Sequence, residues 1–415
     1  MSTRARIGIT IGCVAIFLGS WALTHHSWYA ASGRGGDISI YQYYTQQTLE
    51  GRTPYRNFSI EYPPGFLLPA LAPDATVPAS DLGAYTRDFD RWMAGAGVVL
   101  ILFAAAALAA LRVQADHFAA ALGFIAVSPL LLGELMFSRF DLWPTALAIG
   151  GLSALLTGRD KTSGVLLGAA IATKAWPAVL VPVGLIWVWR RHGRPAGGRW
   201  LLLVVVTCAA FFLPFAALAP GGFGHSFGLQ IDRPLQVESL GSTMLLAAHN
   251  LGGLAVSYKT SFGSLNVIAH GATAAADASA LAQLLALGTI WLAFARGPAR
   301  ADRLVTAAAA SVAVFIAFGK VFSPQYLIWL IPFVPLVRSR LATLLLAIAL
   351  MTTQFYFPTY YNAISLQPSI AWLVLARDLV VVVLAVELTR TLFEREPVEE
   401  SAPALAAEAL PAPAS

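Results

Sequence analysis

Eleven apolar segments constrain this chain more than any other feature of its sequence. They are residues 7–23, 92–111, 118–136, 142–156, 164–189, 200–218, 278–295, 304–318, 326–337, 341–357 and 370–388. Most approach the roughly 20 residues that a helix needs to cross a bilayer. Charged residues make up only 12% of the chain, whereas a soluble domain contains about 25%. The sequence therefore predicts an all-α, polytopic membrane protein with about 11–12 transmembrane helices.

The basic residues are grouped in short clusters between the apolar segments. The formal net charge is +5, which in a soluble protein can indicate nucleic-acid binding. Here the positive-inside rule explains the clusters better, because Lys and Arg next to membrane spans stay in the cytoplasm. We therefore expect a lipid bilayer as a partner and no nucleic acid. The clusters lie at residues 4–6, 112, 158–161, 190–199, 296–303, 338–340 and 390–395.

The segment at residues 164–189 has basic clusters at both of its ends, which breaks the expected alternation. Its middle, IATKAWPAV, contains Lys174 and Pro177. Proline breaks helices, and a lysine at mid-membrane is costly unless it reaches water or a partner. We favour a broken hairpin that crosses twice, whose tip would carry Lys174 to the outer face. The alternative is one long helix that violates the charge rule.

This topology would place a loop at residues 24–91 outside, directly after the first span. Within it, GDISIYQYYTQQTLEG predicts a helix that begins at Asp37 and stops at Gly51, a natural C-cap. The pattern alone favours Asp37 as an N-cap. Asp37 could also act as a general base near the membrane surface, and the two roles are compatible. Later in the loop, Glu61 could pair with Arg56.

Several cations on the predicted outer side could hold a phosphate. Arg139 and Asp141 share the turn FSRFDLWP, where they could neutralise each other or leave Arg139 to bind a phosphate. Lys320, in GKVFSPQ, could compensate a helix dipole or bind a phosphate. The weakest candidates lie in a second outer loop, residues 220–277, where solvated charges are common. These are His225, Asp232, Arg233 and Glu238.

The sequence contains no motif of a soluble enzyme: no Walker loop, dinucleotide fingerprint, HExxH, GxSxG or CxxC. Both cysteines, Cys13 and Cys208, lie in apolar segments, so we expect neither a disulfide nor a metal site. Two other function classes stay open. A secondary transporter predicts paired broken helices in both halves, but the sequence contains one candidate. A flippase for lipid-linked sugars would have charges distributed along its membrane spans, whereas here they gather at one predicted face.

Three stretches together resemble a known family. GDISIYQYY…LEGRTPYRNFSIEYPPG, SRFDLWPTALAIGGLSALLTGRDKTSGVLLGAAIATKAWP and KVFSPQYLIWLIP are similar to the actinobacterial mannosyltransferases of glycosyltransferase family 87, within the GT-C superfamily. The resemblance extends from about Ile7 to about Leu388. It implies transfer of a hexose, mannose by family default, from a polyprenyl-phosphate-sugar donor to a glycolipid or glycan acceptor. The site would face the periplasm of a bacterial plasma membrane, with both termini in the cytoplasm, and the anomeric carbon would be inverted.

The resemblance also implies roles for individual residues. It maps the acid of the family's first loop onto Asp37 as the general base. The donor phosphate would be bound by Arg139, Lys174, Lys320 and Arg233. The substrates would be lined by Tyr41, Tyr44, Glu61, Tyr62, Asp141, His225 and Gln325.

The motif GDI contains a single acid where many relatives have a pair, which argues against a metal-dependent variant. We therefore expect no metal site and no cofactor, with a divalent cation left open. Residues 1–391 would form the glycosyltransferase domain, with short interfacial helices in its first periplasmic loop. Residues 392–415 are rich in Ala, Pro and Glu and predict a disordered cytoplasmic tail.

Overall fold

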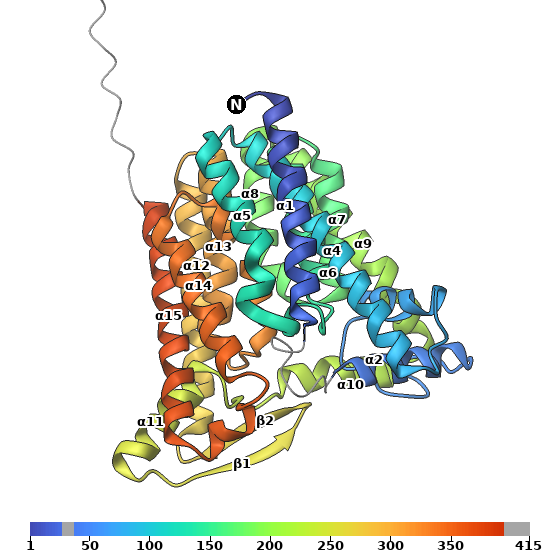
Figure 1. Cartoon of the computed structure of the whole chain (residues 1–415), viewed down its shortest axis with the longest axis vertical. Helices are drawn as coiled ribbons and strands as arrows, with labels where there is room; N and C mark the ends of the chain where they lie inside the picture. Colours follow the sequence, from blue (N-terminus) through green and yellow to red (C-terminus); the bar gives the residue numbers. More distant parts are fainter. Residues whose placement is uncertain (27–36, 394–415) are drawn as a thin grey trace, which may run out of the picture.

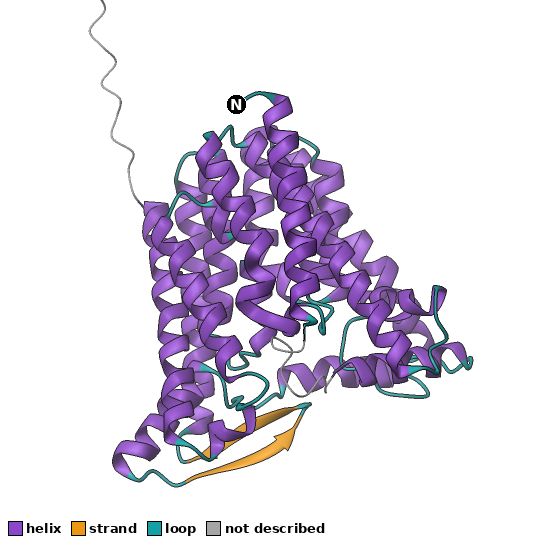
Figure 2. Cartoon of the chain, in the orientation of Figure 1, coloured by secondary structure: helices purple, strands orange, loops and turns teal. Residues whose placement is uncertain are grey.

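The computed structural model describes residues 1–26 and 37–393. The regular elements of this part of the chain are helices, apart from one two-stranded antiparallel hairpin formed by β1 (Val256–Ser261) and β2 (Ser264–Ala269) (Figure 2). The predicted class is therefore confirmed, although the β-hairpin was not predicted. The predicted disordered tail falls almost wholly on residues 394–415, outside the described residues, because the last helix continues to Phe393.

The helices form an upright bundle with shorter elements at one end (Figure 1). Their bounds are α1 Thr3–Thr24, α2 Asp37–Leu49, α3 Leu67–Leu71, α4 Leu82–Ala110, α5 Ala115–Leu132, α6 Leu142–Leu156, α7 Asp160–Thr173, α8 Val181–His192, α9 Arg194–Leu218, α10 Pro220–Ile231, α11 Leu240–Gly252, α12 Ala272–Arg296, α13 Ala301–Ala317, α14 Arg340–Tyr356 and α15 Pro368–Phe393.

Six described helical stretches are long and apolar enough to cross a membrane. They are α1, α4, the stretch Ala115–Met136, α9, α12 and α15. The most apolar windows of α9 and α12 are only 6% and 17% buried inside the protein. Apolar surface of this extent is stable in lipid but not in water. The protein is therefore a polytopic membrane protein, with α9 and α12 among its lipid-facing helices.

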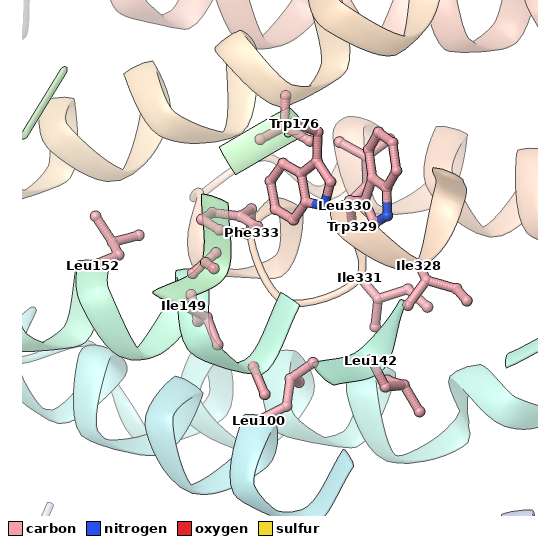
Figure 3. Packing of buried hydrophobic residues seen from close by; sticks show 14 of the residues in the cluster. Leu100, Leu142, Ile149, Leu152, Trp176, Ile328, Trp329, Leu330, Ile331 and Phe333 are labelled. Atoms are coloured by element: carbon pink, nitrogen blue, oxygen red, sulfur yellow. The ribbon is translucent and has the colours of Figure 1, made fainter. Parts of the chain in front are cut away.

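Nine of the eleven predicted segments correspond to one α-helix each. The segment at residues 326–337 instead forms two short 3₁₀ helices, Pro324–Leu330 and Val334–Leu336. Pro332 and Pro335, which lie inside the segment, prevent a continuous α-helix. This compact stretch is buried in the bundle core, where the indole rings of Trp329 and Trp176 lie side by side (Figure 3).

The predicted break in the segment at residues 164–189 is confirmed, while its two crossings of the membrane stay a prediction. Helix α7 ends at Thr173, Lys174 is extended, and a 3₁₀ turn at Trp176–Leu180 leads into α8. His192 Nδ1 at the end of α8 lies 2.6 Å from Asp160 Oδ2 at the start of α7. The chain therefore returns to the end of the bundle from which it came.

The expected exposure of Lys174 at the hairpin tip is wrong. Its side chain is only 14% exposed and contacts Asp141, which is fully buried. A lysine that leaves water needs a partner of opposite charge. Here the turn that contains Asp141 supplies that partner. The tip of the hairpin is thus part of the interior.

The basic clusters, as far as their residues are described, gather at one end of the bundle, which we call the basic end. Arg190 Nη1 donates to the carbonyl oxygen of Ala295 at 3.0 Å, and Arg303 Nη2 donates to that of Ala293 at 2.9 Å. The N-terminus lies at this end, whereas α2, α10 and the β-hairpin lie at the other, the loop end (Figure 1). The alternation inferred from charge is therefore confirmed, while the side of the membrane that each end faces stays a prediction.

Candidate functional site

Asp37 is the first residue of α2, at the loop end. The helix ends at Leu49, and Gly51 adopts a left-handed conformation with φ of 81°, as the predicted C-cap requires. A carboxylate in the first turn of a helix is stabilised by the helix dipole. The predicted helix is therefore confirmed, but Asp37 is its first helical residue and not its N-cap.

The Asp37 carboxylate is held by two side chains from inside the protein. Arg139 Nε lies 3.2 Å from Asp37 Oδ2, and the Tyr41 hydroxyl donates to the same oxygen at 3.4 Å. The Arg139 side chain is 10% exposed, whereas that of Asp37 is 26% exposed. Asp37 is thus fixed in orientation but remains open to a molecule arriving from outside.

Asp141 has a different environment, although it follows Arg139 by two residues. Lys174 Nζ lies 2.6 Å from Asp141 Oδ1, and Trp329 Nε1 donates to the same oxygen at 2.5 Å. The possible turn pair between Arg139 and Asp141 is therefore not formed, since each pairs with a residue from elsewhere in the chain. We call Asp37, Arg139, Asp141 and Lys174 the polar cluster.

Aromatic rings enclose the Lys174 ammonium group. It lies 4.7 Å from the ring centroid of Phe140, 5.4 Å from that of Trp329 and 5.6 Å from that of Tyr326. Tyr326 stacks on Trp329 at 4.1 Å, and Trp329 stacks on Trp176 at 4.9 Å. Cation–π contacts and the ion pair together compensate the lysine for lost hydration.

A second group of rings lies between α2 and the polar cluster. Phe140 lies 4.9 Å from Tyr62 and 4.8 Å from Phe66, and Tyr41 lies 5.1 Å from Phe66. Burial raises the pKa of both Tyr41 and Tyr62 well above its ordinary value, so both hydroxyls stay protonated and able to donate. Tyr44 stacks on Phe58 at 6.0 Å, and burial raises its pKa to about 12.

The Pro-Pro-Gly sequence of the first loop packs against the hairpin that carries Lys174. A Cβ added at Gly65 would lie 2.7 Å from the carbonyl oxygen of Ala172, closer than real Cβ contacts allow. Only glycine permits this approach of the two backbones. The contact brings the loop of Tyr62 and the tip of α7 together around one site.

The structure does not bring all of the predicted residues into the polar cluster. Lys320 Nζ donates to the carbonyl oxygen of Ile231 at 2.6 Å, where it compensates the C-terminus of α10 rather than of its own preceding helix. Arg233 Nη2 donates to the carbonyl oxygen of Phe262 at 2.8 Å and anchors the β-hairpin. His225 is exposed on α10, and the Gln325 side chain accepts from Ser323 at 2.7 Å.

Glu61 is half-buried beside the β-hairpin. A Cβ added at Gly263 would lie 3.0 Å from Glu61 Oε2, and the Glu61 carbonyl oxygen accepts from Gln230 Nε2 at 3.0 Å. Within the described part of the chain, the suggested ion pair with Arg56 is not formed. Glu61 therefore links the first loop to the second.

The interpretation of Glu238 as a solvated loop residue is wrong. Its side chain is fully buried and accepts from the Tyr356 hydroxyl at 2.5 Å. Arg377 donates to its carbonyl oxygen at 3.1 Å, and Arg377 is itself 2.9 Å from Asp378. The signal that could have indicated this network is the Arg-Asp pair inside an apolar 26-residue helix, because charges within a span need partners.

The buried Glu238 predicts a stability that depends on pH. Burial raises its pKa from 4.5 to about 8. Between these values the folded protein holds a proton that the unfolded chain releases, so the free energy of unfolding falls as pH rises from about 4.5 to about 8. The slope is on the order of 1 kcal/mol per pH unit at most, with full stability retained below this window. Melting temperatures in detergent at pH 5 to 8 should show this decline.

Glu238→Gln should flatten that decline, because an amide does not titrate but still accepts the Tyr356 hydrogen bond. Glu50→Gln is the matched control, since Glu50 is exposed and its replacement should leave the slope unchanged. Equal slopes in the two variants would show that Glu238 does not titrate in this range.

Among the described residues, no group of three or more His, Cys, Asp or Glu side chains could hold a metal ion. Asp37 and Asp141 are each engaged by a basic residue. The arrangement offers one accessible carboxylate, an adjacent guanidinium and a buried ion pair behind them. Such a set can accept a proton at Asp37 and stabilise an anion at Arg139.

Comparison with known proteins identifies a family. The sequence profile of glycosyltransferase family 87 matches residues 60–324. No curated protein matches the chain. Among solved structures, the Archaeoglobus fulgidus oligosaccharyltransferase in its apo form is 12% identical over 93% of this chain, with a TM-score of 0.46. The same enzyme tethered to an acceptor peptide is 10% identical over 94% of this chain, with a TM-score of 0.48. The chain spans 55% of the length of both.

Proposed function

Because the chain belongs to glycosyltransferase family 87, we propose that it transfers a hexose, with mannose as the first candidate, from a polyprenyl-phosphate-sugar donor. The acceptor is a hydroxyl of a glycolipid or glycan. The family membership predicted from the sequence is confirmed, and with it glycosyl transfer in general. The donor, the sugar and the face of the membrane belong to the proposal.

The observation that carries this proposal is the contrast between the two aspartates of the polar cluster. Asp141 is fully buried and its Oδ1 accepts from both Lys174 and Trp329, so it cannot reach an acceptor. Asp37 is 26% exposed at the loop end, where short helices and the first loop surround it. A general base must come within hydrogen-bond reach of the hydroxyl that it deprotonates, and of these two carboxylates only Asp37 meets this condition.

The proposed reaction is a single displacement with inversion. Asp37 accepts the proton of the acceptor hydroxyl as its oxygen attacks the anomeric carbon. The bond from that carbon to the phosphate oxygen breaks, and the polyprenyl phosphate leaves with the electron pair and an added negative charge. Arg139 stabilises this charge, since its guanidinium has donors beyond the one that faces Asp37.

Lys174 has a less direct role in this proposal. Its charge is already balanced by Asp141 at 2.6 Å, so it contributes to the field around the phosphate without binding it alone. Tyr41 is buried, so it holds Asp37 in place and cannot line the substrate. Tyr62, which packs against Tyr41 and is partly exposed, can offer its ring to a sugar. Lys320, Arg233, His225 and Gln325 would reach a substrate only where it extends beyond the polar cluster.

The distribution of basic residues supports an assignment of the side of the membrane that the polar cluster faces. The basic clusters lie at the end opposite to α2 (Figure 1), and the positive-inside rule assigns basic clusters to the cytoplasm. The polar cluster would then face the periplasm of a bacterial plasma membrane, at the depth where a lipid carrier presents its phosphate. Both termini would be cytoplasmic.

The direct test is an assay with protein purified in detergent. A synthetic polyprenyl-phosphate-mannose donor should yield a mannosylated acceptor from an extract of envelope glycolipids, and the product linkage should be inverted. A nucleotide-sugar donor should yield none. Turnover with the nucleotide sugar alone would contradict the proposed donor. Movement of the intact donor across vesicles without product would instead support the alternative of a transporter or flippase.

Arg139→Ala is expected to lower transfer by about 30- to 1000-fold, because it removes a charge-assisted contact worth roughly 2–4 kcal/mol to the leaving phosphate. Turnover from the polyprenyl-phosphate-sugar donor is the measurement. Arg56→Ala is the matched control, since Arg56 is exposed in the first loop. Its replacement should leave turnover unchanged. If both variants keep wild-type turnover with unchanged melting, Arg139 neither stabilises the leaving phosphate nor positions a catalytic Asp37.

A further inference from the structure

A cavity of about 1250 Å³ lies at the basic end, opposite to the polar cluster. The ends of α12 and α15, the start of α13 and residues 336–338 surround it. Both α12 and α15 are long and apolar enough to cross a membrane. The cavity therefore opens where the apolar part of the bundle meets the polar surface.

Four arginines line this cavity against a single carboxylate: Arg296, Arg300, Arg303 and Arg338 against Asp302. Asp302 is already bound by two donors of Arg300, both at 3.0 Å. Arg296 and Arg338 are exposed, and within residues 1–26 and 37–393 neither makes an ion pair. The lining has a net charge of +3, with two guanidinium groups available to an anion.

The other walls of the cavity are apolar. They include Leu111, Val113, Leu292, Leu336 and Phe393. Leu292 and Phe393 are 48% and 57% exposed, and the neighbouring turns of α12 present Leu284 and Leu285 at 65% and 63%. An anion that bound here would have an apolar surface of α12 directly beside it, on the side that faces lipid.

We propose that this cavity binds the phosphate headgroup of an anionic phospholipid, whose acyl chains lie along α12. Guanidinium groups bind phosphate through parallel donors, and basic pockets between membrane helices on the cytoplasmic side bind anionic headgroups. The volume exceeds that of a phosphate ion, and the exposed leucines need an apolar partner. The phosphate of a lipid would pair with the arginines, and its acyl chains would cover the exposed leucines.

Binding to the full-length protein in detergent micelles tests this proposal. Dioleoyl phosphatidylglycerol should bind, as measured by native mass spectrometry and by a rise in melting temperature, whereas dioleoyl phosphatidylcholine should have little effect. The double variant R296Q/R338Q should bind phosphatidylglycerol about 10- to 30-fold more weakly, because each basic residue near an anionic surface contributes roughly one power of ten or less. Both arginines are exposed, so the melting temperature in phosphatidylcholine should not change.

Arg199→Gln is the matched control, since Arg199 is exposed in another basic cluster and does not line the cavity. Its affinity for phosphatidylglycerol should equal that of the wild type. Equal loss in Arg199→Gln and in R296Q/R338Q would overturn the proposal in favour of a diffuse surface charge. Stabilisation by inorganic phosphate at the same concentration would overturn it in favour of a site for a free anion.

A third occupant is the chain's own acidic segment, which begins directly after Phe393 with Glu394, Glu396, Glu399 and Glu400. If this segment fills the cavity, the wild type should not bind phosphatidylglycerol, and a variant with these four glutamates changed to glutamine should bind it. That outcome would overturn the lipid assignment. If the wild type binds phosphatidylglycerol and the four substitutions leave its affinity equal or higher, the lipid assignment is supported. None of these measurements depends on sugar transfer.

Discussion

Asp37→Asn is expected to lower sugar transfer by about 10²- to 10⁴-fold, the usual contribution of a general base. Asparagine has the same shape as aspartate, although it lacks the negative charge that the helix dipole stabilises at the start of α2. It cannot accept a proton from the acceptor hydroxyl. The change also leaves the nearly buried Arg139 guanidinium without its counter-charge, so the melting temperature should fall. A purely structural Asp37 predicts this loss of stability with turnover retained in the folded protein, whereas a catalytic Asp37 predicts loss of turnover as well. The measurement is turnover from the polyprenyl-phosphate-sugar donor, alongside the melting temperature of the purified variant.

Asp81→Asn is the matched control for this experiment. Asp81 lies in the same loop and caps α4 by accepting from the backbone amide of Ala84 at 3.0 Å. Asparagine keeps that cap, so transfer and melting should both stay at wild-type values. Near-wild-type turnover of Asp37→Asn would remove Asp37 as the base. Glu61, which is half-buried beside the β-hairpin, would then be the next carboxylate to replace.

Asp141→Ala is expected to destabilise the protein by about 3–5 kcal/mol, because it leaves the Lys174 ammonium buried without a counter-charge. It also removes the acceptor of the Trp329 indole N–H, a donor that cannot find water in the core. Unfolding in detergent with increasing denaturant measures the loss. Asp141→Ala should unfold at a markedly lower denaturant concentration than the wild type.

Two further variants separate charge burial from other effects. Glu50→Ala breaks an exposed pair with Arg52, in which both side chains are more than half exposed, and should cost about 1 kcal/mol or less. The double variant Asp141→Ala/Lys174→Met removes the buried charge as well, and should recover part of the lost stability. If Asp141→Ala costs no more than Glu50→Ala, the Lys174 charge is not in fact buried.

The sequence predicted the elements well wherever the causes are local. Gly51 ends α2 because a left-handed residue must follow the helix. Pro177 lies in the turn that breaks the segment at residues 164–189, as the two basic clusters at its ends required. Proline also explains the one segment whose structure differed, since 3₁₀ turns replace a helix at Pro324–Leu330 and Val334–Leu336.

The sequence predicted the partners of the charged residues poorly. It suggested that Arg139 and Asp141 could neutralise each other, because they lie two residues apart. In the structure Arg139 contacts Asp37, and Asp141 contacts Lys174 and Trp329, the latter 188 residues away. Likewise, Glu238 lies in a loop by sequence, yet it is fully buried against Tyr356. Neither composition nor spacing contains this information.

The sequence by itself determined that the chain is a polytopic membrane protein, that its basic clusters share one end, and that it resembles glycosyltransferase family 87. These properties depend on hydrophobic length, on net charge next to each span and on short motifs, all of which are local. Only the tertiary structure decided which carboxylate is accessible and which cation is neutralised by a neighbouring carboxylate. A charged group in a membrane protein takes the partner that lies nearest in space, and that distance is set by how the helices pack.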